Sequence, residues 1–241
     1  KTEAVNRMAE LSDSEILVFT DADVLVAPSA LKMLVSRFAD PDVGAVCARR
    51  AVDAGTAGCR ARMQQIQKSY ETVIKRGEGV LGRVMGGDGS LYAVRASMFR
   101  RVPSDVPDDF VAVLRVLKSG MKVAYEAVAL AQEKMPDHDP EGLARRRRTV
   151  ARGIKGLWRE RELLNPFRFP LCAFLLFSHK ILRWLGGCLM IGLFLANLAL
   201  ATHPLFVGIL VLQLCCYFFA CLRFFVKGLG AGGVLAIIPY F

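Results

Sequence analysis

The sequence predicts an α/β domain with a parallel sheet, followed by an apolar helical tail. Segments with helical and strand patterns alternate along residues 1–165. Of the 241 residues, 54% are hydrophobic and the mean hydropathy is +0.36, although 22% are charged. Nearly all of the charge precedes Arg168, and Leu, Phe, Ala, Gly, Ile and Val dominate residues 169–241. This division indicates a soluble domain joined to membrane segments.

The first elements have a helix, strand, helix, strand pattern. Residues 1–12 carry apolar side chains at helical spacing, which predicts a helix before the strand Ile16–Thr20. Pro28 and Ser29 mark the start of a second helix, and "VGAVCARR" after it is typical of a second strand. A strand, a helix and a further strand in succession predict a right-handed crossover and a parallel sheet.

The middle of the chain continues this alternation. Residues 58–76 are expected to form a helix, whose apolar stripe consists of Met63, Ile66, Tyr70 and Val73. In the glycine-rich passage that follows, "SLYAVR" predicts a short strand and "ASMF" the opening of a helix. The segment "PDDFVAVLRVLKSG" predicts an amphipathic helix that ends at Gly120, and "MKVAYEAVALAQEKMP" is expected to be extended.

The tail is expected to meet a membrane. Residues 166–184 are interpreted as an interfacial helix, because "FPLCAFLLF" is too short to cross about 30 Å of hydrocarbon before "SHK" interrupts it. Two spans are expected at residues 185–201 and 205–222, and a third near residue 232. The chain begins without Met and stops within an apolar segment, so we expect a fragment.

Positive charge gathers just before this tail. The net charge of +10 is compatible with nucleic acid, anionic lipid or phosphorylated substrates. The run Arg145 to Arg148 adjoins the apolar tail, which favours lipids and phosphorylated substrates and excludes nucleic acid as the expected partner. Such cations also mark the cytoplasmic side, although orientation and lipid contact alone would explain them. We therefore expect a multi-pass protein of the inner or plasma membrane with residues 1–165 in the cytoplasm.

Two acids end the first strand. In "EILVFTDADVLV", the apolar run stops at Asp21 and Asp23. In open α/β sheets ligands collect beyond the carboxyl ends of strands. A carboxylate pair there would suit Mg²⁺ or Mn²⁺, and the cation would neutralise a diphosphate leaving group. The alternative is an ordinary polar strand end, because Asp is common in turns.

A second acidic pair, Asp108 and Asp109, starts the helix of "VPDDFV". Acids in a first helical turn are stabilised by the helix dipole and need no other role. The chemical alternative is that a neighbouring like charge and partial burial raise the pKa of one carboxyl. That group would then accept a proton from an acceptor hydroxyl.

The segment "GGDGSLYAVR" offers a possible ligand-binding loop. Gly87 and Gly89 permit positive φ angles and the close approach of a ligand. Asp88 between them is placed to bind an acceptor hydroxyl. A plain glycine turn between two elements is the alternative interpretation.

These motifs occur in one order, and the order resembles a known family. The segments "FTDAD", "GGDGSLYAVR", "PDDF", "SGMKVAYEAVA" and "RRRRTVARG", followed by "SHKILRW" and "IPYF", are similar to membrane-integrated family 2 glycosyltransferases. Cellulose synthase, hyaluronan synthase and poly-N-acetylglucosamine synthase belong to that group. The resemblance covers essentially the whole chain. It implies a GT-A fold without its first strands and last membrane spans, and inverting transfer of a sugar, usually from a UDP-sugar, to a glycan or polysaccharide hydroxyl.

The resemblance also implies roles for single residues. Asp21 and Asp23 would hold the diphosphate and its Mg²⁺ or Mn²⁺, and Asp109 would be the catalytic base with Asp108 beside it. The other residues implied at the donor diphosphate are Lys1, Asn6, Arg145 and Arg148, and those at the acceptor are Gly87, Asp88 and Gly89. The family's QxxRW motif is not intact, because Thr149 follows Arg148 where the family has tryptophan. This departure argues against long-chain processivity.

Three other functions compete with this reading. A lipid acceptor, such as a polyprenyl phosphate or a diacylglycerol, would leave the metal site unchanged. A degenerate, non-catalytic accessory subunit is the second alternative, because a chain without the family's first strands is expected to bind donor poorly. A haloacid dehalogenase-like phosphatase would use Asp21 as its nucleophile, but Leu25 stands where that class has Thr or Val.

Overall fold

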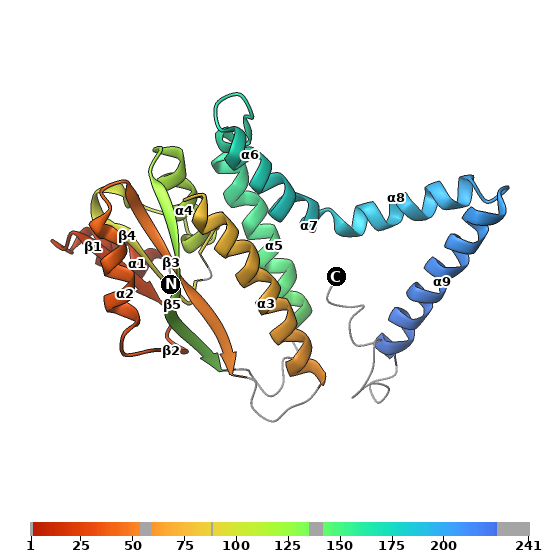
Figure 1. Cartoon of the computed structure of the whole chain (residues 1–241), viewed down its shortest axis with the longest axis horizontal. Coiled ribbons are helices and arrows are strands. Elements are labelled where there is room, and N and C mark those ends of the chain that lie inside the picture. The colour runs from red at the N-terminus through yellow and green to blue at the C-terminus, as the bar shows by residue number, and fades with distance from the viewer. Residues whose placement is uncertain (1, 54–58, 88, 135–141, 226–241) are drawn as a thin grey trace. The chain divides into compact units, whose positions relative to one another are not determined.

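The computed structural model describes residues 2–53, 59–87, 89–134 and 142–225. Its internal contacts divide the chain into two units. The first comprises residues 1–53 and 67–177 and contains the sheet, and the second comprises residues 54–66 and 178–241 (Figure 1). This division falls after α6 (Pro170–Leu176), so that helix belongs to the unit with the sheet.

The sheet has five strands and is mixed. Its order is β1 (Ile16–Thr20), β4 (Leu91–Arg95), β3 (Val43–Asp53), β5 (Lys122–Lys134) and β2 (Val24–Val26). β3 and β5 are parallel, whereas β4 is antiparallel to both β1 and β3, and β2 is antiparallel to β5. The prediction of a parallel sheet is therefore wrong in part. β1 and β3 do run in the same direction, but β4 lies between them and replaces their direct pairing.

Helices cover both faces of the sheet in the first unit. α2 (Ala30–Ser36) buries Leu34 in a cluster with Leu91 and Ala93 of β4. Neighbouring side chains of a strand point to opposite faces. Tyr92 accordingly points away from α2 and contacts the start of α4 (Asp108–Lys118). All of β4 from Leu91 to Val94 is buried, as expected for a strand covered on both faces.

Two further elements differ from the expectations. The "ASMF" segment forms only a 3-10 turn (Ala96–Met98) instead of opening a helix. α3 (Cys59–Val80) is longer than predicted, and Ile66, Tyr70 and Val73 of its apolar stripe are exposed among the described residues. The other elements are α1 (Thr2–Glu10), η1 (Arg37–Ala39), α5 (Gly142–Arg159) and η3 (Arg161–Leu164).

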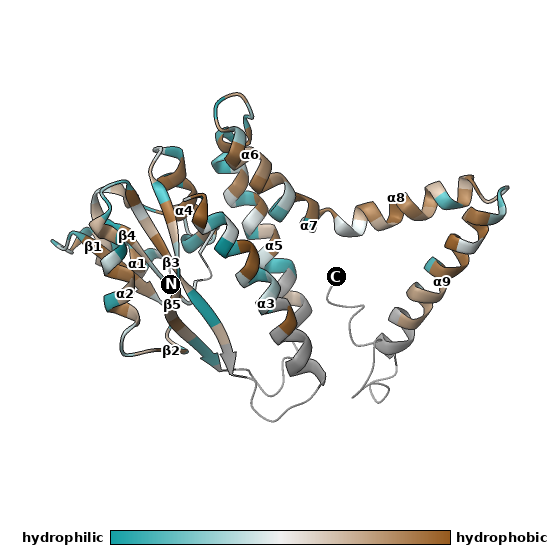
Figure 2. Ribbon diagram, viewed as in Figure 1, coloured by the Kyte–Doolittle hydropathy of each residue, from teal (hydrophilic) through white to brown (hydrophobic). Residues whose placement is uncertain are grey.

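The described part of the second unit after residue 177 is helical and apolar. After a π-helical turn (Phe177–Ile181) and α7 (Leu182–Trp184), it contains α8 (Gly186–Ala199) and α9 (Pro204–Phe225), which follow the two predicted spans closely. Figure 2 shows these two helices as mostly hydrophobic. Among the described residues, no single helix is long and apolar enough to cross a membrane. The bent pair Pro170–Trp184 and Gly186–Ala199 reaches that length and composition together.

Candidate active site

The first acidic pair lies where β1 ends. Asp21 directly follows Thr20 and is half-buried, and Asp23 is exposed in the turn that leads to β2. The backbone N–H of Val24 donates to the carbonyl oxygen of Asp21 at 3.3 Å, which closes this turn. The predicted strand, with Asp21 directly after it, is therefore confirmed. The two acids differ in exposure, because Asp21 is half-buried and Asp23 is exposed.

The second acidic pair lies at the start of α4. Asp108 is buried, and Asp109 is half-buried. The Tyr92 hydroxyl donates a long hydrogen bond of 3.5 Å to Asp108 Oδ2. Burial raises the pKa of Tyr92, and the charges of Asp108 and Asp109 raise it further, so the phenol stays protonated and remains a donor. Tyr92 thus contacts Asp108 from the core, and no sequence pattern predicted this contact.

The glycine loop lies against one acid of each pair. A methyl group on Gly89 would lie 3.2 Å from Asp21 Oδ2 and 3.5 Å from Asp109 Oδ2. A methyl group on Gly87 would lie 3.1 Å from the Cβ atom of Asp109. Gly89 also has a φ angle of +70°, which L side chains rarely adopt. The loop therefore needs glycine both for its conformation and for the close approach of two carboxylates.

A cavity adjoins this cluster. Its volume is about 570 Å³, and it extends along β1 and α1. Its lining includes Thr20, Gly89, Tyr92 and Asp108. Ligand sites of proteins commonly have volumes of about 300–1,000 Å³, with a few polar groups in a mostly apolar wall. The cavity is therefore large enough for a small organic ligand beside the acidic cluster.

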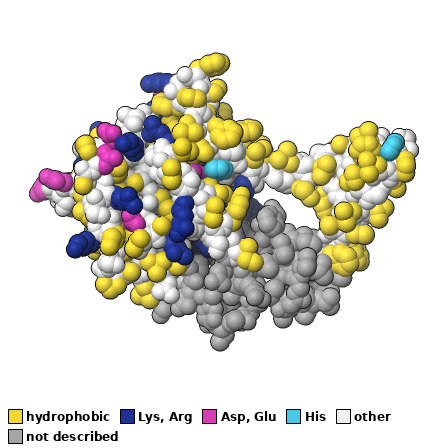
Figure 3. Space-filling model, viewed as in Figure 1, with side chains coloured by type: hydrophobic (Ala, Val, Ile, Leu, Met, Phe, Trp, Pro, Cys, Tyr) yellow, Lys and Arg dark blue, Asp and Glu magenta, His cyan; other side chains and the backbone are white. Residues whose placement is uncertain are grey.

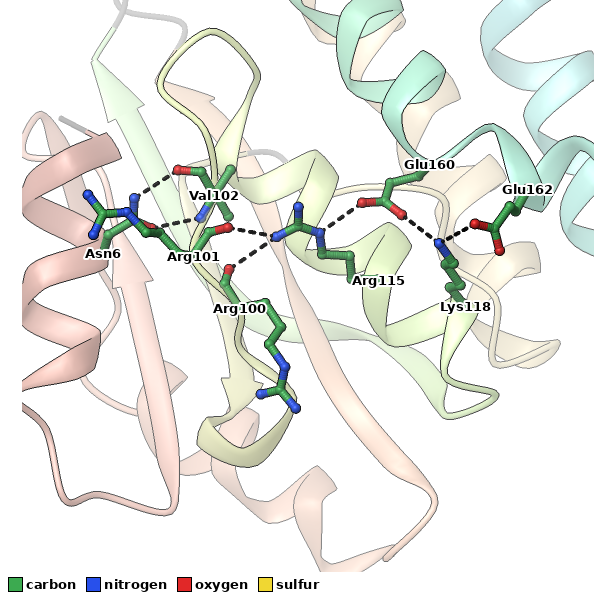
Figure 4. A network of polar contacts seen from close by, with 8 residues as sticks. All are labelled: Asn6, Arg100, Arg101, Val102, Arg115, Lys118, Glu160 and Glu162. Carbon is green, nitrogen blue, oxygen red and sulfur yellow. Dashed lines mark hydrogen bonds and ion pairs between the residues drawn. The ribbon is translucent and has the colours of Figure 1, made fainter.

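A polar network anchors α4 at the end away from its acids (Figure 4). Arg115 donates to Glu160 Oε1 at 2.8 Å and to the carbonyl oxygen of Arg101 at 2.9 Å. Lys118 contacts Glu160 at 3.4 Å and Glu162 at 2.9 Å. Glu160 is buried, and Arg115 and Lys118 are its ion-pair partners. The network fixes the helix whose first turn carries Asp108 and Asp109.

The other predicted donor residues are bonded elsewhere, exposed, or outside the described residues. Asn6 is buried, and its amide exchanges two hydrogen bonds with the backbone of Val102, at 2.8 and 2.9 Å. A donor role for Asn6 would require that pair to open. Arg148 is exposed on α5. Lys1, Asp88 and the side chain of Arg145 lie outside the described residues.

The acidic cluster has the ligand chemistry of a site for a hard divalent cation. Asp21 and Asp109 supply carboxylate oxygens beside Gly89, and Asp23 is near Asp21 in sequence. Mg²⁺ and Mn²⁺ prefer such oxygen ligands, and Mg²⁺ usually takes several further ligands from water and substrate phosphates. No group of three or more His, Cys, Asp and Glu side chains in the described part of the chain is arranged to hold a metal. A cation at Asp21 and Asp109 would therefore need further ligands from water or a bound phosphate group.

Comparison with known proteins gives two sequence matches. Residues 1–102 match the family described as Glycosyl transferase family 2. Over 134 residues the chain is 25% identical to the O-antigen chain rhamnosyltransferase RfbN of Salmonella typhimurium (strain LT2). That match covers 52% of this chain and 43% of the relative, so the chain spans less than half of the relative's length.

Two solved structures are also similar in part. The mannosyltransferase PcManGT from Pyrobaculum calidifontis, in complex with GDP-Man and Mn²⁺, has a TM-score of 0.49 and 21% identity, over 88% of this chain and 63% of that chain. Glucosyl-3-phosphoglycerate synthase from Mycobacterium tuberculosis, with Mn²⁺ and UDP-Glc, has a TM-score of 0.41 and 16% identity, over 66% and 53%. The two sequence matches support a glycosyltransferase, with residues 1–102 as its family 2 region.

Proposed function

We propose that this protein transfers a sugar from a nucleoside diphosphate sugar to an acceptor hydroxyl, with inversion at the anomeric carbon. The observation that carries the proposal is the meeting of Asp21 and Asp109 beside Gly89, next to a cavity. The family 2 match over residues 1–102 supports it, since it includes Asp21, Asp23 and the glycine loop. A UDP-sugar is the proposed donor, in line with the resemblance of the ordered motifs.

Each acid has a separate task in the proposed reaction. Asp109 accepts the proton of the acceptor hydroxyl while the acceptor oxygen bonds to the anomeric carbon. The bond from that carbon to the diphosphate oxygen breaks, and its electron pair leaves with the nucleoside diphosphate. Asp21 and Asp23 would hold Mg²⁺ or Mn²⁺, and the bound cation would supply positive charge for the departing diphosphate. Asp108 stays beside the base and accepts the hydrogen bond from Tyr92.

The acceptor is proposed to be a glycan or polysaccharide. The name of the rhamnosyltransferase relative refers to an O-antigen chain, which supports this class of acceptor. Gly87, Asp88 and Gly89 would contribute to its binding. Transfer to a lipid acceptor is the second candidate, and the apolar second unit favours it because such an acceptor would be held at a bilayer.

Association with the inner or plasma membrane, with residues 1–165 in the cytoplasm, is part of the proposal. α6 has no charged side chain, and it buries Cys172, Ala173, Leu175 and Leu176 while exposing Leu171 and Phe174. Most large side chains of α8 and α9 are exposed as well, and Figure 3 shows hydrophobic side chains over much of these helices on the face in view. Exposed apolar surface of this extent is typical of contact with lipid or another protein. We also propose that the protein belongs to the membrane-integrated synthase subtype.

Release of nucleoside diphosphate tests the proposed function directly. The full-length gene product, in membranes, would be supplied with UDP-, GDP- and dTDP-sugars together with Mn²⁺ or Mg²⁺, and then with a chelator. We expect metal-dependent release from one donor and its loss on chelation. Parallel assays with a glycan or with a polyprenyl phosphate as acceptor separate the two acceptor classes. No release from any donor by the folded protein would contradict the proposal and favour the accessory-subunit alternative.

A further inference from the structure

Thr20, the last residue of β1, makes a contact that links the two sides of the candidate site. The paired residues of β1 and β4 end at Thr20 and Leu91. Ser90 precedes Leu91 and lies just beyond that pair. The Thr20 hydroxyl donates a hydrogen bond of 2.8 Å to the carbonyl oxygen of Ser90. A side chain therefore continues the connection between the two strands where the backbone ladder stops.

The position of this bond gives it a role beyond strand pairing. Thr20 is followed directly by Asp21, and Ser90 is preceded directly by Gly89. Gly89 in turn lies against the carboxylates of Asp21 and Asp109. The bond thus joins the segment that carries the first acid to the loop that separates the two acids.

The Thr20 hydroxyl has two possible acceptors, and their distances differ. The carbonyl oxygen of Asp21 lies 3.3 Å from the hydroxyl oxygen, whereas that of Ser90 lies 2.8 Å away. A hydroxyl has one proton to donate, so the shorter contact is the stronger one. The Ser90 carbonyl is therefore the favoured acceptor of the Thr20 hydroxyl.

We propose that Thr20 is a positioning residue that sets the separation between the metal-binding acid Asp21 and the base Asp109, by tying the end of β1 to the glycine loop at Ser90. The inference rests on the proposed function for the roles of the two acids. Because the net value of one hydrogen bond is modest, the expected effect on activity is small but measurable.

Two substitutions of Thr20 isolate the hydroxyl. Thr20→Val removes it and keeps the β-branched shape that suits a strand, and Thr20→Ser keeps it. The matched control is Thr72→Val, which removes a hydroxyl bond of the same 2.8 Å length, from Thr72 to the Lys68 carbonyl within α3. Thr72 is a residue of α3, and the control therefore leaves the β1 end and the glycine loop unchanged.

The first measurement is a Mn²⁺ titration of nucleoside diphosphate release by the full-length protein. We expect Thr20→Val to raise the Mn²⁺ concentration for half-maximal activity about fivefold, whereas Thr20→Ser and Thr72→Val stay within about twofold of the unmodified protein. An unchanged Mn²⁺ requirement and turnover in Thr20→Val would overturn the inference while leaving the proposed function intact. An equal shift in Thr72→Val would show a general effect of stability and would also overturn it.

Hydrogen exchange of the backbone amides tests the tie itself, independently of activity. Peptides that cover residues 84–92 should exchange faster in Thr20→Val than in Thr20→Ser, and Thr72→Val should leave them unchanged. If the unmodified protein releases no nucleotide, the proposed function fails, and this exchange still decides whether Thr20 holds the loop. Equal protection of the loop in all four proteins would overturn the inference.

Discussion

The carboxylates of Asp21 and Asp109, which come from distant parts of the sequence, border a single glycine. A methyl group on Gly89 would lie within 3.2 Å of one and 3.5 Å of the other. Two carboxylates on either side of one small residue offer a cation oxygen ligands from two elements of the chain. A divalent ion with a diphosphate ligand is the occupant proposed above.

The base assignment is tested by Asp109→Asn, which removes the proton acceptor and keeps the shape of the side chain. We expect turnover to fall by about 10²-fold to 10⁴-fold, because general base catalysis contributes an effect of this size. Donor binding should persist, since Asp21 and Asp23 are unchanged. Steady-state release of nucleoside diphosphate and a separate donor-binding titration would measure the two quantities.

The exposed Asp13 supplies the control, as Asp13→Asn has the same chemistry outside the site. It should keep normal turnover. Near-normal turnover of Asp109→Asn, with donor binding retained, would show that Asp109 is not the base. Asp108 would then be the next candidate for the base.

The glycine loop is tested by Gly89→Ala. The new methyl group would meet Asp21 Oδ2 at 3.2 Å, and a φ angle of +70° strains any L side chain. We expect the free energy of unfolding to fall by about 1 kcal/mol or more and metal-dependent activity to fall further, because the loop must move away from both acids. Chemical denaturation and nucleotide release would measure these changes.

Gly77→Ala is the matched control for the loop. Gly77 lies within α3, and nothing lies within 4 Å of the position of its added methyl group. Because alanine is the better helix former, we expect a gain of about 0.5–1 kcal/mol in the free energy of unfolding and unchanged activity. A loss of activity in Gly77→Ala as large as that in Gly89→Ala would contradict the local explanation.

The sequence predicted those parts of the fold that depend on local pattern. The strand Ile16–Thr20 and the helix from Asp108 were predicted from an apolar run and from apolar spacing, and both are confirmed. The antiparallel insertion of β4 was not predicted, since pairing partners are chosen by long-range packing and leave no mark in a short strand. The exposed stripe of α3 shows the same limit, because spacing identifies an apolar face but not what covers it.

The candidate site was predicted only in its acids and glycines. Their types and order pointed to Asp21, Asp109 and Gly89, which the structure brings together. Tyr92 was missed, because a tyrosine in an apolar strand gives no sign that its hydroxyl reaches an acid. Asn6 shows the reverse case, in which a residue with a role implied by resemblance is held by backbone partners in the structure.

Removal of the Glu160 side chain from the polar network at the end of α4 should destabilise the protein strongly. Its side chain is only 7% exposed and is shared by Arg115 and Lys118. Glu160→Ala would leave these two cations without their buried partner, so we expect the free energy of unfolding to fall by about 3 kcal/mol. Urea denaturation measures the change. Glu162→Ala is the control, because Glu162 is exposed, and its effect should be much smaller; equal effects would show that burial of Glu160 is unimportant.

The Lys118–Glu162 pair predicts a dependence of stability on pH. The hydrogen bond to Glu162 is the main cause that raises the pKa of Lys118, and the bond from Lys118 is the main cause that lowers the pKa of Glu162. The lysine contribution is thus present at neutral pH and lost as the pH rises through its raised pKa. The glutamate contribution is lost as the pH falls through its lowered pKa.

Lys118→Met should therefore destabilise the protein most near neutral pH. The difference from the unmodified protein should shrink below the usual pKa range of glutamate and above that of lysine. Urea denaturation at acidic, neutral and alkaline pH measures it. A difference that stays constant over the whole range would show that Lys118 acts through packing of its methylene groups instead of its charge.

A buried polar contact links α8 and α9, and its removal should loosen their pairing. Asn197 and Gln213 are both buried, and the Asn197 amide donates to Gln213 Oε1 at 2.9 Å. Gln213 also donates to the Tyr217 hydroxyl at 2.6 Å. Hydrogen bonds of this kind hold helices together where the surroundings are apolar, and they contribute about 0.6–2 kcal/mol each.

A double-mutant cycle measures this contact. Asn197→Leu should cost about 1–3 kcal/mol of unfolding free energy, since it leaves Oε1 of the buried Gln213 without this donor, and Gln213→Leu should cost a similar amount. The double variant should cost less than the sum of the two, because neither polar group is then left alone. Additive costs would mean that the two side chains act independently and that other contacts pair the helices.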